Sequence, residues 1–137
     1  MSNFSNEVLE RIEKISNNQE INNSSNAFMR ASTKPKYCYN FSWLGRPIIQ
    51  YPQDIVAMQE IIWKVKPDLI IETGIAHGGS LIFSSSMLAL LDMEEAIRDN
   101  KLLDLENSSR KVLGIDVDIR KHNKASIEEH SMSRYIQ

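Results

Sequence analysis

The feature that most constrains the fold of this 137-residue chain is a short apolar run that leads directly into a glycine-rich segment. Leu69-Ile70-Ile71 is a continuous apolar run, which is typical of a strand buried on both faces in a parallel sheet. The segment Glu72–Ser80 follows, and a second apolar stretch after it predicts a helix from about Ser80 to Met93. This strand–loop–helix unit predicts a nucleotide-type binding site at the carboxyl end of a parallel sheet.

The segments on either side continue the alternation of helices and strands. Pro52 is placed for the first turn of a helix that Pro67 ends. The later predicted elements are a charged helix end and surface insertion over Glu94–Arg110, a buried strand over Val112–Ile115, a short helix over Ala125–His130 and the opening of a third strand over Arg134–Gln137. Alternation of this kind predicts an α/β fold, with a parallel sheet and flanking helices.

The N-terminal third of the chain differs from the rest. Apolar residues at helical spacing predict a short amphipathic helix around Val8–Ile15, and the Asn- and Ser-rich stretch Ser16–Ser25 predicts a mobile linker. Aromatic residues then gather over Tyr37–Tyr51, where Gly45 and Pro47 exclude a regular helix, so we expect an ordered extended arm that its aromatic side chains anchor. The prediction is a helix and flexible linker over residues 1–36, followed by a binding domain over residues 37–137.

Composition excludes several classes of function. The formal net charge is −2 and the basic residues are scattered, so we expect no nucleic-acid binding. Cys38 is the only cysteine, which excludes an intrachain disulfide and a cysteine-rich metal site. The sequence shows no signal peptide and no apolar stretch long enough for a bilayer, so we expect a soluble cytoplasmic protein.

The spacing of the glycines indicates which ligand the loop suits. A dinucleotide site would show G-x-G-x-x-G, whereas this chain has E-x-G-x-x-x-G-x-S. That pattern suits S-adenosylmethionine, which has no pyrophosphate, and it disfavours a short dehydrogenase. We expect Gly74 to leave room for the ligand, Gly78 and Gly79 to allow close approach at the helix start, and Ser80 to cap the helix or donate to the ligand. The alternative is a turn that only packs a helix on a sheet.

Acidic side chains follow both predicted strands. Glu72 is predicted to accept the ammonium group of the cofactor, directly or through water, and capping of the helix N-terminus is the alternative. Asp116 is predicted to bind the ribose hydroxyls, with Asp118 as second choice. Both aspartates could instead be solvated residues at a strand end. His77 lies in the loop, where it faces the cofactor, the substrate or only solvent, and His122 and His130 are expected at the surface.

Long contiguous stretches of the chain resemble one enzyme family. The sequence is similar to the cephalosporin hydroxylase / rhamnosyl O-methyltransferase family over Ser42–Asp54, Glu60–Trp63, Glu72–Ser80 and Gly114–Arg120, and at His122 and Asn123. The similarity runs from about residue 40 to the C-terminus, apart from the predicted insertion.

The resemblance implies a Rossmann-like class I methyltransferase fold, S-adenosylmethionine as cofactor, and O-methylation of a small molecule or a glycolipid sugar, as in lipid biosynthesis. It places the cofactor at the following residues: Glu72, Gly74, His77, Gly78, Gly79, Ser80 and Asp116. Relatives continue through further strands, with an Mg²⁺ site, so we expect this chain to be a truncated N-terminal portion without the catalytic base or the metal ligands. Its partner would be a second copy or the missing C-terminal portion. The alternative is a non-catalytic fragment that pairs with a partner chain through an open sheet edge.

Overall fold

The computed structural model describes residues 3–137 and divides into two compact units, Met1–Tyr37 and Cys38–Gln137. The predicted domain boundary between residues 36 and 37 lies within one residue of this division. None of the helices within the described range has the length and apolar character needed to cross a bilayer.

The first unit contains two helices, α1 (Asn3–Ser16) and α2 (Gln19–Thr33). The amphipathic helix predicted around Val8–Ile15 is confirmed by α1. The predicted mobile linker is wrong, because most of Ser16–Ser25 belongs to α2. Asn18 caps α2 by accepting a hydrogen bond from the Ile21 N–H at 3.0 Å, and Gln19 donates to Asn23 one turn later at 2.9 Å. Capping and contacts between side chains one turn apart stabilise a helix that buries little apolar surface.

The second unit begins with a hairpin where a single extended arm was predicted. A 3₁₀ turn, η1 (Tyr37–Tyr39), precedes β1 (Phe41–Trp43), which pairs antiparallel with β2 (Arg46–Ile48). The two residues between the strands, Leu44 and Gly45, both have positive φ, as a tight two-residue turn requires. Trp43 anchors the hairpin, because its ring packs edge-on against the ring of Phe83, with 5.0 Å between the ring centroids. The expectation of an aromatic anchor is therefore confirmed, but the chain reverses within the arm.

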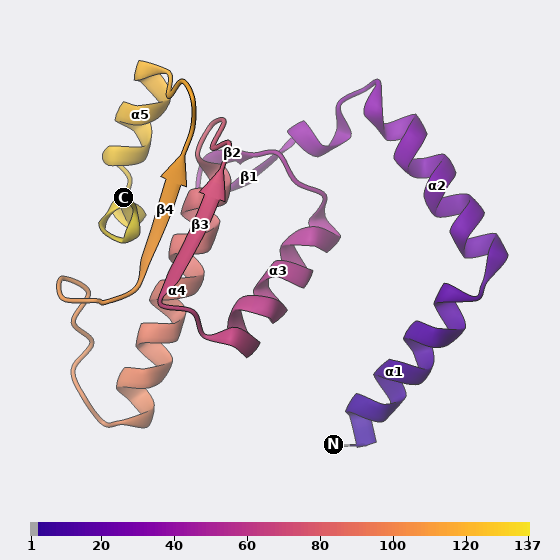
Figure 1. Cartoon of the computed structure of the whole chain (residues 1–137), viewed down its shortest axis with the longest axis horizontal. Helices are drawn as coiled ribbons and strands as arrows, with labels where there is room; N and C mark the ends of the chain where they lie inside the picture. Colours follow the sequence, from indigo (N-terminus) through magenta and orange to yellow (C-terminus); the bar gives the residue numbers. More distant parts are fainter. Residues whose placement is uncertain (1–2) are drawn as a thin grey trace. The chain divides into compact units, whose positions relative to one another are not determined.

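The remaining elements follow the predicted order. They are α3 (Pro52–Val65), β3 (Leu69–Thr73), α4 (Gly79–Arg98), β4 (Lys111–Ile115), α5 (Lys121–Glu128) and η2 (Ser131–Tyr135). The strands β3 and β4 lie side by side and are parallel (Figure 1). In their register, Glu72 is opposite Gly114 and Thr73 is opposite Ile115. Ile136 forms a further parallel bridge to Val112. The predicted third strand thus begins two residues late, because Arg134 and Tyr135 belong to η2.

The segment predicted as a helix end and surface insertion is more ordered than its charge suggested. The helix α4 extends to Arg98, and the connection to β4 ends in Arg110, which is buried. Its guanidinium group binds the carboxylates of Asp92 and Glu95, and Tyr135 donates to Asp92 at 2.6 Å. Four charged or polar groups therefore join the end of α4 to β4 and η2.

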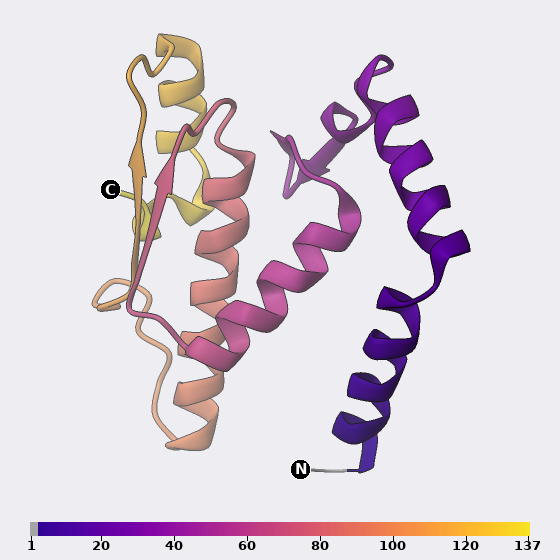
Figure 2. The same ribbon diagram turned by 45° about the vertical axis from the view of Figure 1, so that its right-hand side comes forward.

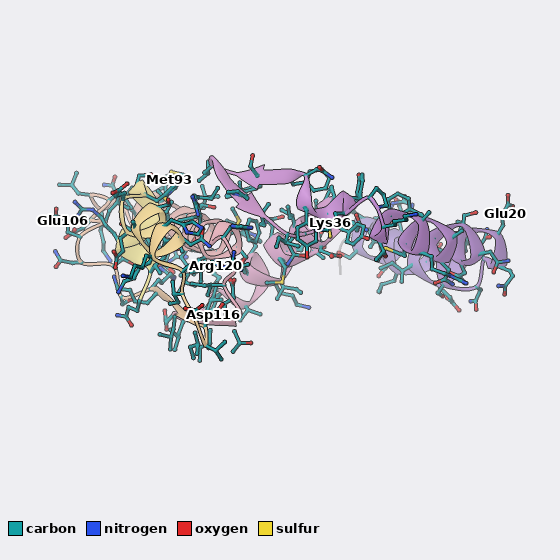
Figure 3. All side chains as sticks on the ribbon, turned by 90° about the horizontal axis from the view of Figure 1, so that it is seen from above. Glu20, Lys36, Met93, Glu106, Asp116 and Arg120 are labelled. Atoms are coloured by element: carbon teal, nitrogen blue, oxygen red, sulfur yellow. The ribbon has the colours of Figure 1, made fainter. Side chains whose placement is uncertain are left out.

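The helices of the second unit lie on one side of the sheet. Figure 2 shows α3, α4 and α5 together on one face of β3 and β4, and the core forms there around Leu81, Leu88 and Val112. The other face is exposed at Ile71 and Ile115, with 59% and 49% of their surface accessible. Figure 3 shows side chains near Asp116 that project from this face with no ribbon beyond them. The prediction that Leu69–Ile71 is buried on both faces is therefore wrong, because the described helices cover only one face. The arrangement is part of a Rossmann-like α/β fold, with a parallel sheet and flanking helices.

Candidate functional site

The glycine-rich loop makes a tight turn between β3 and α4. Three of its residues, Gly74, Ala76 and Gly78, have positive φ values of 81°, 44° and 81°. The Gly78 N–H closes the turn by donating to the Ile75 carbonyl at 2.7 Å, and the Gly74 N–H donates across to Ile115 at 2.8 Å. The loop therefore starts at the carboxyl end of the sheet and delivers the chain to the N-terminus of α4.

The glycines of the loop have two different surroundings. A Cβ added at Gly74 would meet no atom within 4 Å, so this position opens onto free space. A Cβ at Gly78 would overlap the side chain of Ile127 on α5, and one at Gly79 would overlap the backbone of Pro47 on β2. The close approach predicted at the helix start is thus made by the protein's own elements. Gly74 is the glycine with room for a ligand.

This contrast predicts different costs for two alanine substitutions. Gly79→Ala should lower the free energy of unfolding by about 3 kcal/mol, because the β2 backbone has to move away. Gly74→Ala should cost about 1 kcal/mol, since only its left-handed backbone is strained. Urea unfolding of both variants measures the difference. Equal costs would show that the hairpin does not pack on the start of α4.

Glu72 lies at the wall of a cavity of about 390 Å³, within the usual size range of small-molecule sites. The other lining residues come from the hairpin, α3, β3, the loop and α4; among them are Gln50, Asp54, Met58, Gly74, His77, Gly79, Ser80 and Phe83. Ser80 donates a hydrogen bond to the Glu72 carboxylate, so it serves neither as a helix cap nor as a free donor. The N-cap of α4 is Gly78.

The carboxylate of Glu72 is partly removed from water. Burial raises its pKa above the ordinary value of 4.5, and the hydrogen bond from Ser80 opposes this shift. Within residues 3–137, no Lys, Arg or His side chain forms an ion pair with Glu72. A half-buried carboxylate without a cation favours either protonation or a cationic ligand.

Asp116 contacts the loop from the end of β4. Its carboxylate accepts hydrogen bonds from the Ile75 N–H at 2.9 Å and from the Asp118 N–H at 3.1 Å. Backbone hydrogen bonds, chiefly from Asp118 and Ile75, lower the pKa of this carboxyl group. Each carboxylate oxygen has a second lone pair, so Asp116 can brace the loop and still accept from a ligand. The side chain of Asp118 is exposed.

The predicted site residues thus fall into two groups. Five of them line one cavity, namely Glu72, Gly74, His77, Gly79 and Ser80. Gly78 is buried against α5, and Asp116 lies outside the cavity lining.

Residues far from the loop in sequence also hold it. Asn123 donates to the Ala76 carbonyl and Arg46 to the His77 carbonyl. Composition and periodicity gave no sign of either contact, although both residues belong to the stretches that resemble the family. His130 is also more than a surface residue, because its Nε2 bonds the Leu44 carbonyl at 3.0 Å while its Nδ1 accepts from Met132.

The acidic residues do not gather into a metal site. Among the residues that the structure describes, no group of three or more His, Cys, Asp or Glu side chains is arranged to hold a metal ion. These residues therefore do not fit the Mg²⁺ that the family resemblance implies.

A comparison with known protein families gives a match over most of the chain. Residues 35–137, more than half of the chain, match the family described as rhamnosyl O-methyltransferase/CmcI. No curated protein and no solved structure gives a significant match. The match confirms the resemblance found in the sequence, and the chain belongs to the rhamnosyl O-methyltransferase/CmcI family of methyltransferases.

Proposed function

We propose that the chain binds S-adenosylmethionine at the Glu72–Ser80 loop and serves methyl transfer to an oxygen of a small molecule or a glycolipid sugar. One observation carries the proposal. The half-buried Glu72 carboxylate has no cationic partner in the described residues, and it stands beside the open space at Gly74. S-adenosylmethionine offers an ammonium group and a sulfonium, and both suit such a position.

The Glu72 carboxylate would accept a hydrogen bond from the ammonium group of the cofactor. A cation at this point returns the electrostatic stabilisation that the carboxylate loses through burial. Ser80 fixes the orientation of the carboxylate before the cofactor arrives. A hydrogen bond between two charged groups contributes about 1.5 to 3 kcal/mol.

The loop and β4 would hold the other polar groups of the cofactor. The first amide N–H groups of α4 have no partner within the helix, so they can bind the methionine carboxylate. Asp116 can accept from the ribose hydroxyls, because it follows the strand adjacent to β3. The two ends of the cofactor would therefore be held by the two neighbouring strands.

When bound, S-adenosylmethionine supplies an activated methyl group for in-line displacement by an oxygen nucleophile. The residues of this chain bind and orient that donor, which removes part of the entropic cost of the reaction. Apolar side chains of Ile48, Ile55 and Phe83 line the cavity beside the loop and limit the access of water to it.

Calorimetric titration of S-adenosylmethionine into the full chain tests this proposal. We expect one site, and we expect Gly74→Val to abolish binding because its side chain occupies the open space. Asp116→Ala should weaken binding at least tenfold, through loss of a hydrogen bond to a charged group. Asp118→Ala is the matched control and should change the affinity less than twofold. Binding that survives both Gly74→Val and Asp116→Ala would contradict the site assignment.

A second candidate function is favoured by the exposed sheet face. Leu69, Ile71 and Ile115 expose about half of their surfaces, as in an interface, and β3 has only one neighbouring strand among the described residues. A partner chain that paired with the open edge of β3 and packed on this face would cover the three apolar side chains. A folded chain that binds no S-adenosylmethionine would favour this second candidate.

A further inference from the structure

Two side chains from distant elements hold consecutive carbonyl groups of the glycine-rich loop. Asn123 is buried on α5 and donates its Nδ2 to the Ala76 carbonyl at 2.9 Å. Arg46 on β2 donates to the His77 carbonyl from Nη2 at 2.5 Å and from Nε at 3.2 Å. The Nη2 of Arg46 also lies 3.5 Å from the Asn123 Oδ1, so the two side chains form one connected group.

Because the peptide bond is planar, a contact that holds a carbonyl group also fixes the direction of the N–H group of the next residue. A carbonyl and the N–H of the next residue lie in one plane and point in opposite directions. Because Asn123 holds the Ala76 carbonyl, the His77 N–H is directed to the opposite side of the loop from α5. Because Arg46 holds the His77 carbonyl, the Gly78 N–H is directed toward Ile75, whose carbonyl it reaches at 2.7 Å.

The loop needs such support because its backbone is unfavourable at one residue. Ala76 has a φ of 44°, in the left-handed region that residues with a Cβ avoid. Such a conformation persists when surrounding contacts determine it. The contacts at the Ala76 and His77 carbonyls come from outside the loop, on elements that pack against Gly78 and Gly79.

We propose that Arg46 and Asn123 are positioning residues, which fix the loop in its cofactor-binding conformation before the cofactor binds. This inference rests on the proposed function. Preorganisation raises affinity because the ordering of the loop is not left to the binding step. The forked donors of Arg46 matter here, since a lysine carries the same charge but cannot supply two donors in a fixed plane.

The test combines two measurements on the full chain. Amide hydrogen exchange by NMR reports the Gly78 N–H, and calorimetry reports the affinity for S-adenosylmethionine. We expect Asn123→Ala and Arg46→Lys each to speed the Gly78 exchange and to weaken binding about five- to tenfold, the effect of one hydrogen bond. Tyr135→Phe is the control, because it removes the hydrogen bond to Asp92 and should lower the melting temperature without changing either measurement.

Two results would overturn the proposal. Unchanged Gly78 exchange in both variants would show that the loop does not depend on these side chains. Full affinity in Arg46→Lys would show that the charge of Arg46 acts, and not its forked hydrogen bonds. If the unaltered chain binds no S-adenosylmethionine, the proposed function is wrong. The exchange of the Gly78 N–H in the two variants then still shows whether Arg46 and Asn123 hold the loop.

Discussion

Substitution of Glu72 by Gln should weaken the binding of S-adenosylmethionine roughly 100-fold, because a charge-assisted hydrogen bond of about 2 to 3 kcal/mol is lost. The same substitution should make the ligand-free chain more stable at neutral pH. The half-buried carboxylate is destabilised in the folded state and solvated in the unfolded state, and Gln removes that difference. Opposite changes in affinity and stability are the expected signature of a binding carboxylate.

The pH dependence of stability follows from the direction of the pKa shift. Burial raises the folded-state pKa of Glu72 above the ordinary value of 4.5. Its contribution to stability is therefore fully present below pH 4.5 and is lost as the pH rises through the folded-state pKa. Urea unfolding of the unaltered chain and of Glu72→Gln should be compared from below pH 4.5 to neutral pH. The difference between their free energies of unfolding should grow toward neutral pH.

The exposed Glu60 on α3 offers a matched control for this substitution. Glu60→Gln also removes one negative charge, and it should leave the affinity and the pH profile unchanged. If Glu72→Gln behaves like Glu60→Gln in both measurements, Glu72 has no part in cofactor binding.

The second large effect is expected at Arg110. Arg110→Met should lower the free energy of unfolding by about 3 to 5 kcal/mol, because it leaves the carboxylate of Asp92 without its buried cation. Burial raises the pKa of Asp92, but hydrogen bonds from Ser108, Tyr135 and Arg110 outweigh it and lower the pKa overall. The stability that this pair contributes is thus lost as the pH falls through the folded-state pKa of Asp92.

The ion pairs of Arg98 provide the comparison for Arg110. Arg98 pairs with Glu94 and Asp99 at the surface, and 53% of its side chain is exposed. Arg98→Met should therefore destabilise the chain far less than Arg110→Met does. Denaturant unfolding of both variants at neutral pH, and again at an acidic pH below 3.8, measures the two effects. A cost at Arg110 as small as that at Arg98 would contradict the buried network.

The sequence predicted the parts of the fold whose signals are local. The apolar run Leu69–Ile71 and the glycines after it form β3 and the loop, and Val112–Ile115 forms most of β4. The placement of Glu72 and Gly74 at one cavity also follows from local order, since both lie at the end of β3.

The parts that were missed or wrong depend on contacts between distant residues or on capping. The Asn- and Ser-rich composition of Ser16–Ser25 indicated a mobile linker, but most of this stretch belongs to α2. The prediction gave too little weight to Asn18, which caps the start of that helix. Arg110 was assigned to a surface insertion because a charged segment does not reveal that its last residue is buried between two carboxylates. Arg46 and Asn123 lie 77 positions apart in sequence, and no periodic pattern joins them.

Chemical-shift mapping by NMR tests the central claim most directly, because it reports where S-adenosylmethionine binds on the full chain. Saturable shifts at the amides of Gly74, His77 and Gly79, with smaller changes on α1 and α2, are the expected result. Absence of shifts in a folded chain, or shifts confined to the far end of α4, would contradict a cofactor site at the Glu72–Ser80 loop.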